Sequence, residues 1–341
     1  MTEPGLTASD TDTQWQGMRV LVTGGLGFVG SNLVHRLVGL GAFVTVVDAL
    51  IPGHGGNRAN IAGVESTVRV VIGDLRDRPL MEAIVTGQDV IFNLAGQISH
   101  EDSMADPFTD LALNTLAPLT LLEACRSTNR EARIVFTATR QSYGKPQYVP
   151  VDERHPMLPV DTNGVHKWAG EYYHLLYHRV YGMRTCSLRL TNTYGPRQVH
   201  DRHTQGVFPF WIGRALAGLP LALYDGGHEL RDANYVEDVV DALLLAGTHD
   251  AAIGEAFNLG GEPVSLRQFA ETLSDVVGGV ELIDVPYPPN RKVIAPGDTY
   301  LEYGKISRVL HWMPRTPLRE GIAKTVAFYR ESGQYAVCST E

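Results

Sequence analysis

Short apolar runs alternate with amphipathic stretches through the first half of the chain. The runs are rich in Val, Ile and Leu, which is typical of strands buried on both faces of a parallel sheet. The stretches between them repeat apolar residues at helical spacing, most clearly over 110–128 and 162–181. The predicted strands cover residues 19–23, 43–48, 68–72, 90–94, 134–138 and 185–189.

This alternation predicts an α/β fold, namely a doubly wound parallel-sheet Rossmann fold with helices on both faces. Beyond residue 190, Pro, Gly and aromatic residues become frequent, and helices are predicted over 207–217, 236–246, 266–277 and 318–329. We therefore expect a Rossmann domain over 18–190, completed by part of 235–260. A smaller C-terminal substrate-binding lobe over 191–333 should rest against the carboxyl ends of the strands, where open α/β sheets bind ligands.

The composition excludes several classes of protein. Segments 1–17 and 334–341 are predicted to be frayed tails, and the first has neither the basic start nor the apolar core of a signal peptide. No apolar run is long enough to span a membrane. The net charge of −9 comes without a block of like charges, which disfavours nucleic acid and anionic membranes as partners. The three cysteines are far apart, so we expect reduced thiols and a cytoplasmic protein.

The first predicted strand ends at a turn in which Gly24, Gly27 and Gly30 are spaced G-x-x-G-x-x-G. These glycines allow a tight turn, a close approach of the backbone to a pyrophosphate, and close packing of the next helix on the sheet. The N-terminus of that helix attracts phosphate. The second strand ends in Asp48, where a ribose-binding acid is expected, and no Arg follows before Arg58. A carboxylate there accepts ribose hydroxyls and repels a 2′-phosphate, so the sequence predicts NAD rather than NADP.

Further motifs carry a resemblance to a known family. They are Gly73-Asp74-Leu75, Asn93-Leu94-Ala95-Gly96, Ser142-Tyr143-Gly144, Arg189-Leu190-x-Asn192-x-Tyr194-Gly195-Pro196-Arg197, and Arg231-Asp232 followed by Tyr235-Val236-x-Asp238. Together with the glycine turn, they resemble the extended short-chain dehydrogenase/reductase family of NAD-dependent nucleotide-sugar epimerases and dehydratases. The resemblance extends over nearly the whole chain from Met18 to Tyr329.

The resemblance implies two sets of binding residues. Asp74 and Leu75 should flank the adenine, and the segment 93–96 should pass under the nicotinamide ribose. The residues implied for NAD are Gly24, Gly27, Phe28, Val29, Gly30, Asp48, Asp74, Leu75, Leu94, Ala95, Gly96 and Lys167. Those implied for a nucleotide-diphosphate sugar are Gln97, Thr139, Arg140, Asn192, Val207, Tyr224, Arg231 and Arg291. An Arg fork matches phosphate geometry, although Arg231 could instead form an ion pair with Asp232 or Glu229.

The resemblance also implies an active site made of a hydroxyl residue and the motif Tyr-x-x-x-Lys. Thr139 and Lys167 match the hydroxyl and the lysine, but Asn163 stands four residues before Lys167. An amide does not accept a proton usefully near neutral pH, although it can orient a substrate or a water. The base is then Tyr143, His166 or Lys167 itself, or the site binds its ligands without turnover.

The residues after Thr139 narrow the reaction. The dehydratases of the family have an Asp-Glu pair there and the decarboxylases a Glu two residues on, whereas this chain has Arg140 and Gln141. Elimination of water requires a general acid. We therefore predict an NAD-dependent epimerase of a nucleotide-diphosphate hexose, most simply at C4. A dehydratase or other modifying enzyme with atypical acid–base residues, and a non-catalytic protein that binds NAD and nucleotide sugar, are the alternatives.

Two further predictions concern the helix over 162–181. His174 and His178 lie one turn apart, but without a third ligand we interpret them as part of an ordinary helix face and predict no metal site. Aromatic residues at helical spacing, from Trp168 to Tyr177, indicate core packing or a dimer face. Because family members often pair through this helix and the one over 110–128, the resemblance implies a homodimer.

Overall fold

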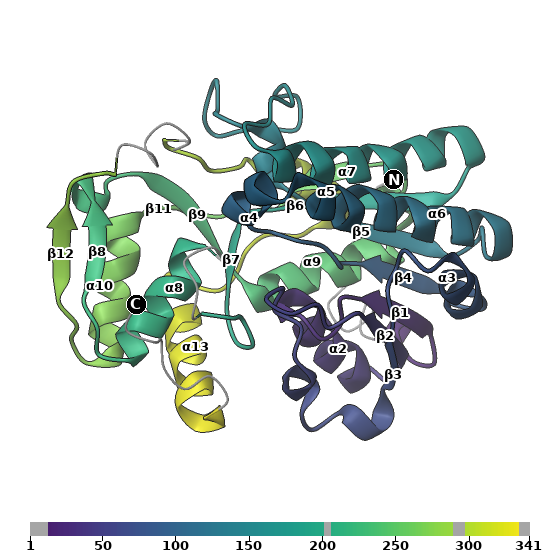
Figure 1. Cartoon of the computed structure of the whole chain (residues 1–341), viewed down its shortest axis with the longest axis horizontal. Helices are drawn as coiled ribbons and strands as arrows, with labels where there is room; N and C mark the ends of the chain where they lie inside the picture. The colour runs from purple at the N-terminus through teal and green to yellow at the C-terminus, as the bar shows by residue number, and fades with distance from the viewer. Residues whose placement is uncertain (1–12, 201–205, 289–296, 334–341) are drawn as a thin grey trace, which may run out of the picture.

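The computed structural model describes residues 13–200, 206–288 and 297–333. Its largest element is a seven-stranded sheet with the strand order β10-β6-β5-β4-β1-β2-β3 (Figure 1). Every neighbouring pair in this sheet is parallel. The strands are β1 (Arg19–Thr23), β2 (Phe43–Asp48), β3 (Arg69–Ile72), β4 (Val90–Asn93), β5 (Arg133–Thr139), β6 (Arg184–Leu190) and β10 (Ala256–Asn258).

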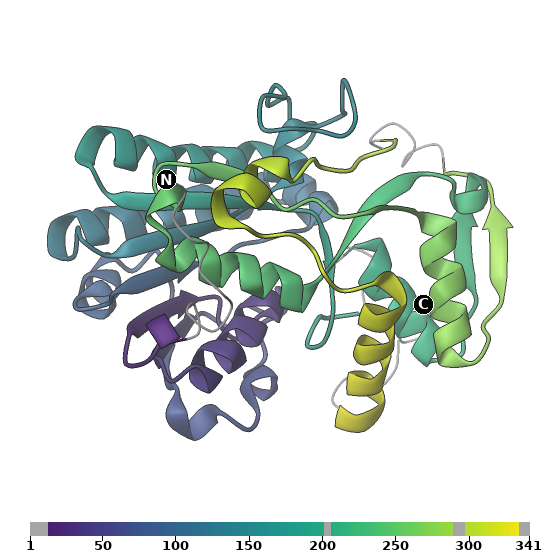
Figure 2. The same ribbon diagram turned by 180° about the vertical axis from the view of Figure 1, so that it is seen from behind.

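Helices cover both faces of this sheet, as Figures 1 and 2 show from opposite sides. Their apolar stripes form a separate buried cluster on each face. One cluster involves α2 (Phe28–Gly39), α9 (Val236–Thr248) and α12 (Gly304–Leu310). The other involves α3 (Arg78–Val85), α6 (Ala117–Thr128) and α7 (Thr162–Tyr181). The predicted doubly wound Rossmann fold is confirmed.

The second lobe lies at one end of the molecule and has its own core, centred on Tyr194, Phe208 and Phe269 (Figure 1). It contains two small sheets, one with the order β11-β9-β7 and one that pairs β12 with β8. The elements are β7 (Asn192–Tyr194), α8 (Val207–Leu216), β8 (Leu221–Tyr224), β9 (Leu230–Tyr235), β11 (Pro263–Ser265), α10 (Leu266–Val277), β12 (Leu282–Val285) and α13 (Leu318–Ser332).

The two lobes interleave along the chain. Beyond residue 190 the chain returns to the large sheet with α9 and β10, and it returns again with α12. Ile306, Leu310 and Trp312 are buried in the large-sheet core, because apolar residues one helical turn apart present one face of α12. The segment 304–312 therefore packs with the Rossmann layer and not with the smaller lobe.

The structure corrects the prediction of a frayed tail as far as residue 17. Trp15 is fully buried and its ring packs on Phe92 of β4, with 5.9 Å between ring centroids. A buried indole removes a large apolar area from water, so the ordered part begins before the first strand. The rest of that segment, residues 1–12, and the predicted tail 334–341 lie outside the described residues.

The helix predicted over 110–128 is interrupted. It consists of α5 (Pro107–Leu111), a π-helical segment Ala112–Leu116, and α6. Pro118 has no N–H to donate to the carbonyl of Asn114, and the ordinary helical ladder cannot continue there.

The neighbouring α4 (His100–Ala105) is short. The 3₁₀ turns are Arg58–Ile61, Glu65–Thr67, Arg140–Tyr143, Asp225–Gly227 and Asp250–Ala252. Within the ranges that the structure describes, no helix is long and apolar enough to cross a membrane.

Candidate active site

A cavity of about 850 Å³ lies between the carboxyl ends of the large sheet and the smaller lobe. Its walls include the turns after β1, β2, β4 and β5, the start of α7, and residues of α8 and β9. This is the edge at which open parallel sheets bind ligands. Most of the predicted site residues line it: Gly24, Gly27, Phe28, Val29, Gly30, Asp48, Asp74, Leu75, Leu94, Ala95, Gly96, Gln97, Thr139, Arg140, Asn163, Lys167, Asn192, Val207 and Arg231.

The glycine turn after β1 leaves no room for side chains. Gly24 has a φ of +66°, which disfavours other residues, and a Cβ there would lie 2.9 Å from the Cα of Ala95. A Cβ on Gly30 would lie 2.2 Å from the carbonyl oxygen of Gly24. The N-cap of α2, Gly27, provides no side-chain hydrogen bond. The first backbone N–H groups of α2 therefore meet the cavity without a competing side chain, as a phosphate site requires.

Asp48 forms the wall of the cavity at the end of β2. Its Oδ2 accepts a hydrogen bond from the backbone N–H of Leu26 (3.1 Å), and its Oδ1 accepts one from Leu50 (2.9 Å). Burial raises the pKa of this carboxyl, whereas the two backbone donors oppose the shift. The carboxylate is thus fixed in orientation at the place where a ribose would lie. Nearby, Asp74 pairs with Arg76 at 2.6 Å, and this hydrogen bond lowers the pKa of Asp74.

A polar network supports the chain segment after β4. The hydroxyl of Thr23 accepts hydrogen bonds from the backbone N–H groups of Leu94 and Ala95, both at 3.1 Å. A Cβ on Gly96 would lie 2.6 Å from Oδ1 of Asn114 and 2.8 Å from Nζ of Lys167. The backbone at Gly96 therefore passes directly over these two polar groups. A flat ligand can follow the same path across the cavity floor.

Lys167 extends from α7 to the bottom of the cavity. Its Nζ donates to the carbonyl oxygen of Thr137 at 3.3 Å and lies 5.4 Å from the centroid of the Phe136 ring. Burial lowers the pKa of Lys167 to about 8, and the charge of Asp110 opposes that shift. A buried ammonium group of this kind donates hydrogen bonds and supplies positive charge.

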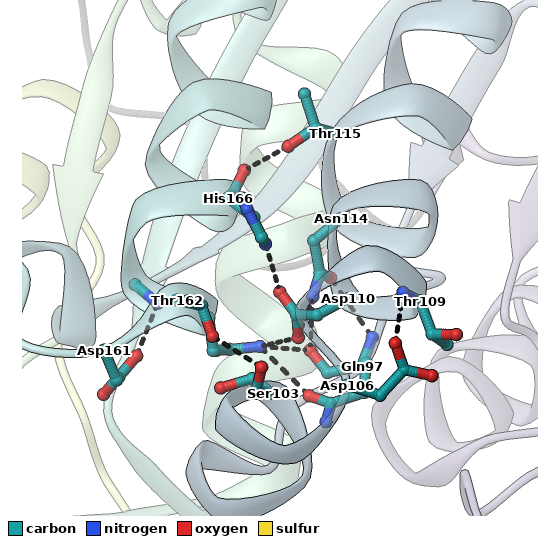
Figure 3. Close-up of polar contacts among 12 residues, drawn as sticks. Gln97, Ser103, Asp106, Thr109, Asp110, Asn114, Thr115, Asp161, Thr162 and His166 are labelled. Atoms are coloured by element: carbon teal, nitrogen blue, oxygen red, sulfur yellow. Dashed lines mark hydrogen bonds and ion pairs between the residues drawn. The ribbon is translucent and has the colours of Figure 1, made fainter.

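The amide of Asn163 is committed to a buried network around Asp110. Its Nδ2 lies within hydrogen-bond distance of three acceptors, namely the carbonyl oxygen of Gln97 (2.9 Å), Oε1 of Gln97 (3.1 Å) and Oδ2 of Asp110 (3.0 Å). Figure 3 shows Asn114 and His166 directed toward Asp110, with Gln97 beside them. His166 Nδ1 lies 2.7 Å from Oδ1 of that carboxylate. Asn163 and His166 therefore complete a structural network beside the cavity, and His166 does not line it.

Arg140 and Arg231 both line the cavity. Arg140 Nη2 donates to Oδ1 of Asn192 at 3.3 Å. Burial and the nearby charge of Arg231 lower the pKa of Arg140 to about 10, so it stays protonated at neutral pH. Arg231 pairs with Glu229 at 2.7 Å and donates to the carbonyl oxygens of Leu230 and Gly297. The ion pair with Glu229 is present, and Arg231 lines the cavity as well.

Comparison with known proteins identifies the family. The model of the NAD dependent epimerase/dehydratase family matches residues 20–260. The chain belongs to this family. UDP-glucose 4-epimerase of Mycolicibacterium smegmatis is 35% identical over 324 residues, covering 93% of this chain and all of that protein.

Solved structures of the family agree with this assignment. UDP-glucose 4-epimerase of Thermotoga maritima, solved with UDP-glucose, has a TM-score of 0.83 and 30% identity, over 93% of this chain and 100% of that one. The dTDP-glucose 4,6-dehydratase DesIV of Streptomyces venezuelae, solved with NAD, has a TM-score of 0.82 and 30% identity, over 94% and 99%. The chain is therefore an enzyme of the nucleotide-sugar epimerase/dehydratase family.

The cofactor of this enzyme is NAD, and the residues present fit it. The glycine cradle at α2, the fixed carboxylate of Asp48, and the floor from Leu94 to Gly96 form one continuous path along the cavity. Glycines leave backbone N–H groups open to a pyrophosphate, and a carboxylate suits a ribose diol. Lys167 stands at the far end of this path, beside Gly96.

The prediction of Tyr143 as a candidate base does not agree with the structure. Tyr143 is 1% exposed and is not part of the cavity wall. Its hydroxyl donates to Oδ1 of Asn258 (2.7 Å) and accepts from Nη1 of Arg189 (2.5 Å), which itself pairs with Glu171. Burial raises the pKa of Tyr143 well above its usual range. The phenol of Tyr143 is therefore part of the core that joins the 3₁₀ turn Arg140–Tyr143 to β6 and β10.

Tyr224, another predicted substrate residue, does not line the cavity in the described structure. Tyr224 lies behind Tyr287, with 5.0 Å between the ring centroids, and Tyr287 is the ring that lines the cavity. Arg291 lies outside the described residues. No group of three or more metal-ligating side chains with suitable geometry occurs in the described part of the chain.

Sequence reasoning missed several polar residues of the cavity wall, among them His100, Gln141 and Asp161. His100 forms an ion-pair contact with Asp161 through Nδ1, and its Nε2 lies 2.5 Å from Nε2 of Gln141. The sequence alone identifies Gln141 only as a position where the dehydratases have a carboxyl group and this chain has none. The motif Asp161-Thr-Asn marks Asp161 as a helix N-cap, but the sequence has no signal that pairs it with a residue 61 positions away.

Proposed function

We propose that this enzyme is a 4-epimerase that inverts the configuration of a nucleotide-diphosphate hexose through a transient ketosugar. The reaction removes a hydride from C4 and a proton from its hydroxyl group, lets the ketosugar rotate in the site, and returns the hydride to the opposite face of C4 and the proton to the same oxygen. NAD, when bound, accepts the hydride with its electron pair and gives it back, so no net oxidation occurs. Each remaining step needs a group of the chain that binds, orients or moves a proton.

The observation that carries the proposal is the turn after β5. Thr139, Arg140 and Gln141 all line the cavity, and none of the three has a carboxyl group. Elimination of water from a ketosugar needs both a base for the C–H proton and an acid for the departing hydroxyl. Epimerisation needs one group that takes a proton and returns it to the same oxygen. The absence of a carboxyl group from this turn favours epimerisation over elimination of water.

The residues divide between chemistry and binding. In this proposal Thr139 hydrogen-bonds the reacting hydroxyl, and Lys167 binds the nicotinamide ribose and supplies positive charge near the hydride acceptor. Asn163 holds Gln97 and Asp110 in place. It orients the wall of the sugar site and takes no part in proton transfer. None of these three roles requires a phenol before Lys167.

The opposite wall suits a diphosphate. The charge of Arg231 contributes to the lowered pKa of Arg140, so the two guanidinium groups lie near each other, and Asn192 accepts a hydrogen bond from Arg140. Two guanidinium groups with an amide form charge-assisted hydrogen bonds to phosphate oxygens. The Thermotoga relative was solved with UDP-glucose, which supports a nucleotide-diphosphate hexose as the substrate class.

The test uses the purified enzyme and a panel of UDP-, dTDP-, CDP- and GDP-hexoses, with C4 epimers separated by chromatography. We expect one nucleotide class to reach an equilibrium between its two C4 epimers. Thr139→Val should lower the rate roughly tenfold through loss of one hydrogen bond. Thr272→Val, which removes an exposed hydroxyl of α10 bonded to Gln268, is the matched control.

Two outcomes contradict the proposal. A deoxy-ketosugar product shows a dehydratase, which is the activity of the DesIV relative. Tight binding of NAD and nucleotide sugar without any product shows a non-catalytic binding protein.

A further inference from the structure

We propose that His100 is the group that takes the hydroxyl proton and returns it, with Asp161 and Gln141 as its positioning residues. This inference rests on the proposed epimerase function, since it supplies the acid–base group that Asn163 lacks. Its central residue, His100, was singled out by no motif of the chain.

The position of His100 is fixed by the backbone around it. His100 is the first residue of α4, and the hydroxyl of the N-cap Ser99 accepts a hydrogen bond from the backbone N–H of Asp102 (3.1 Å). The carbonyl oxygen of Ser99 accepts one from Nε2 of Gln97 (3.0 Å). Ser99 is 2% exposed, whereas the side chain of His100 is 44% exposed and lines the cavity. A rigid backbone therefore presents an accessible imidazole to the cavity.

Asp161 determines the tautomer of this imidazole. Its side chain is only 8% exposed, and its Oδ1 caps α7 by accepting from the backbone N–H of Gly164 (2.7 Å). Its Oδ2 contacts Nδ1 of His100. An ionised carboxylate can only accept, so Nδ1 carries the hydrogen and Nε2 carries the lone pair. Burial raises the pKa of Asp161, but the hydrogen bonds from His100 and from the backbone N–H of Gly164 outweigh it and keep this pKa below its usual value.

Gln141 connects the imidazole to Thr139. Its backbone N–H donates to Oγ1 of Thr139 (3.2 Å), and its amide nitrogen lies 2.5 Å from Nε2 of His100. Oε1 of Gln141 is buried and makes no hydrogen bond within the described residues. If Nε2 becomes protonated, rotation of the amide brings this oxygen to the new N–H. The same side chain can thus stabilise both protonation states of the ring.

The other groups of the wall are less suited to this role. Tyr143 is in the core, and the amide nitrogen of Asn163 can only donate. Lys167 lies against Gly96 and the carbonyl of Thr137, on the cofactor side of the cavity. Glu101 and Asp102 also line the cavity, from the turn of α4 that follows His100.

In the proposed step a proton moves between the substrate hydroxyl and Nε2 of His100. The substrate hydroxyl binds Oγ1 of Thr139 and replaces the amide of Gln141 at Nε2. As the carbon gives up its hydride, the O–H bond breaks, its electron pair becomes the second C–O bond, and the proton moves to Nε2. The imidazolium cation lies beside the Asp161 carboxylate. On the return step Nε2 gives the proton back to the same oxygen.

The first experiment measures formation of reduced nicotinamide by rapid mixing of the NAD-loaded enzyme with UDP-glucose, and with the hexose that the panel selects. His100→Gln should slow this step about 100-fold or more, the usual contribution of a general base. Asp161→Asn keeps the helix cap, because Asn is an equally good N-cap, but turns an amide N–H₂ toward Nδ1. It should slow the step at least tenfold, with nucleotide-sugar affinity unchanged within about twofold for both variants.

The second experiment reads the imidazole directly by ¹⁵N NMR of histidine-labelled enzyme with NAD bound and no sugar. We expect His100 to be the Nδ1–H tautomer in the wild type and the Nε2–H tautomer in Asp161→Asn, which a purely structural role would not produce. His228→Gln, an exposed histidine of the smaller lobe, assists the assignment and should react at the wild-type rate.

The outcomes separate the two proposals. A His100→Gln variant within about threefold of the wild-type rate, or a wild-type His100 in the Nε2–H form, overturns the role of His100 and leaves the epimerase standing. Wild-type enzyme that never reduces its NAD on any nucleotide sugar overturns the epimerase, and the role of His100 with it.

Discussion

We propose that Asp48 determines which nicotinamide cofactor the protein prefers. Its carboxylate is held by two backbone N–H groups and lines the cavity, so a 2′-phosphate would meet fixed negative charge. We expect NAD to bind at least tenfold tighter than NADP, a difference of ~1.4 kcal/mol or more. Asp48→Asn should remove most of this preference in calorimetric titrations.

The matched control for that titration is Asp77→Asn. Asp77 caps α3 by accepting from the backbone N–H of Leu80 and does not line the cavity, so its replacement should leave the preference unchanged. Equal affinities of the wild-type protein for NAD and NADP would contradict the role of Asp48.

His174 makes the protein sensitive to acid. Its ring is fully buried, stacks on Phe136 with 4.3 Å between centroids, and contacts the carbonyl oxygen of Gly170 (2.7 Å). Burial, with a contribution from Lys167, lowers its pKa to about 4. Between about pH 6.5 and 4 the unfolded chain therefore binds a proton that the folded chain rejects, and the free energy of unfolding falls as pH falls, by about 3 kcal/mol in all.

Urea unfolding across this pH range tests the role of His174. His174→Gln should make the free energy of unfolding less dependent on pH, whereas His228→Gln, which replaces an exposed histidine, should not. An unchanged pH slope in His174→Gln would show that other groups cause the loss of stability in acid.

At the scale of elements, the contact between α7 and the π-helical segment supports the active site. Gly170 of α7 faces the carbonyl oxygen of Asn114, and a Cβ there would lie 2.6 Å from that oxygen and 3.1 Å from the Phe136 ring. Asn114 in turn holds the backbone of Gln97 through two hydrogen bonds of 3.1 Å. The spacing of the two helices therefore sets the shape of the cavity floor.

Gly170→Ala should destabilise the protein by ~1–3 kcal/mol through overpacking, and it should weaken NAD binding, because the floor shifts with α7. Gly39→Ala is a matched helical control, since a Cβ at Gly39 meets nothing within 4 Å, and it should stabilise the protein by ~0.5–1 kcal/mol. Denaturant unfolding with calorimetric NAD titration measures both effects. Equal stability of the two variants would show that α7 can move away from the π-helical segment without cost.

The sequence predicts the elements well where the signal is local. The bounds of β1, β2, α7 and α10 agree with the predicted ranges, because each has its own apolar period and a turn or cap at its ends. The strand β10 has only three residues, Ala256–Asn258, and is too short for a period to be recognised. The break before α6 had a readable signal in Pro118, which the helical pattern of its neighbours concealed.

The site could be predicted only in part, for a similar reason. The glycine turn, Asp48 and Lys167 occur in short motifs that determine their own local geometry. Whether Tyr143 faces the cavity or the core depends on Arg189, which is 46 residues away and brought close by β6. The pair formed by His100 and Asp161 likewise exists only after α4 and α7 have packed together. Motifs cannot reveal such contacts, because they depend on the tertiary fold.

At the scale of the whole molecule, we expect a homodimer that pairs through the outer surface of α5 and α7, which lie side by side (Figure 1). Phe108 of α5 is 81% exposed, and Trp168 and Tyr172 of α7 are 36% and 48% exposed. Exposed apolar and aromatic side chains on neighbouring helices are typical of an interaction surface.

Phe108→Lys should convert the dimer to a monomer, as measured by light scattering after size-exclusion chromatography. Phe43→Lys changes a similarly exposed phenylalanine (68%) at the start of β2, away from this surface, and should leave the dimer intact. A wild-type monomer, or a Phe108→Lys variant that remains dimeric, would contradict the proposed interface.

We propose that the enzyme inverts C4 by moving a hydride off and back onto the same carbon. The most direct measurement is proton NMR of the reaction in D₂O with the nucleotide hexose that the panel selects. We predict that the two C4 epimers interconvert while every carbon-bound hydrogen of the sugar is retained, since the hydride never exchanges with solvent. A product that has lost water and gained deuterium from the solvent would contradict it, as would a complete absence of conversion.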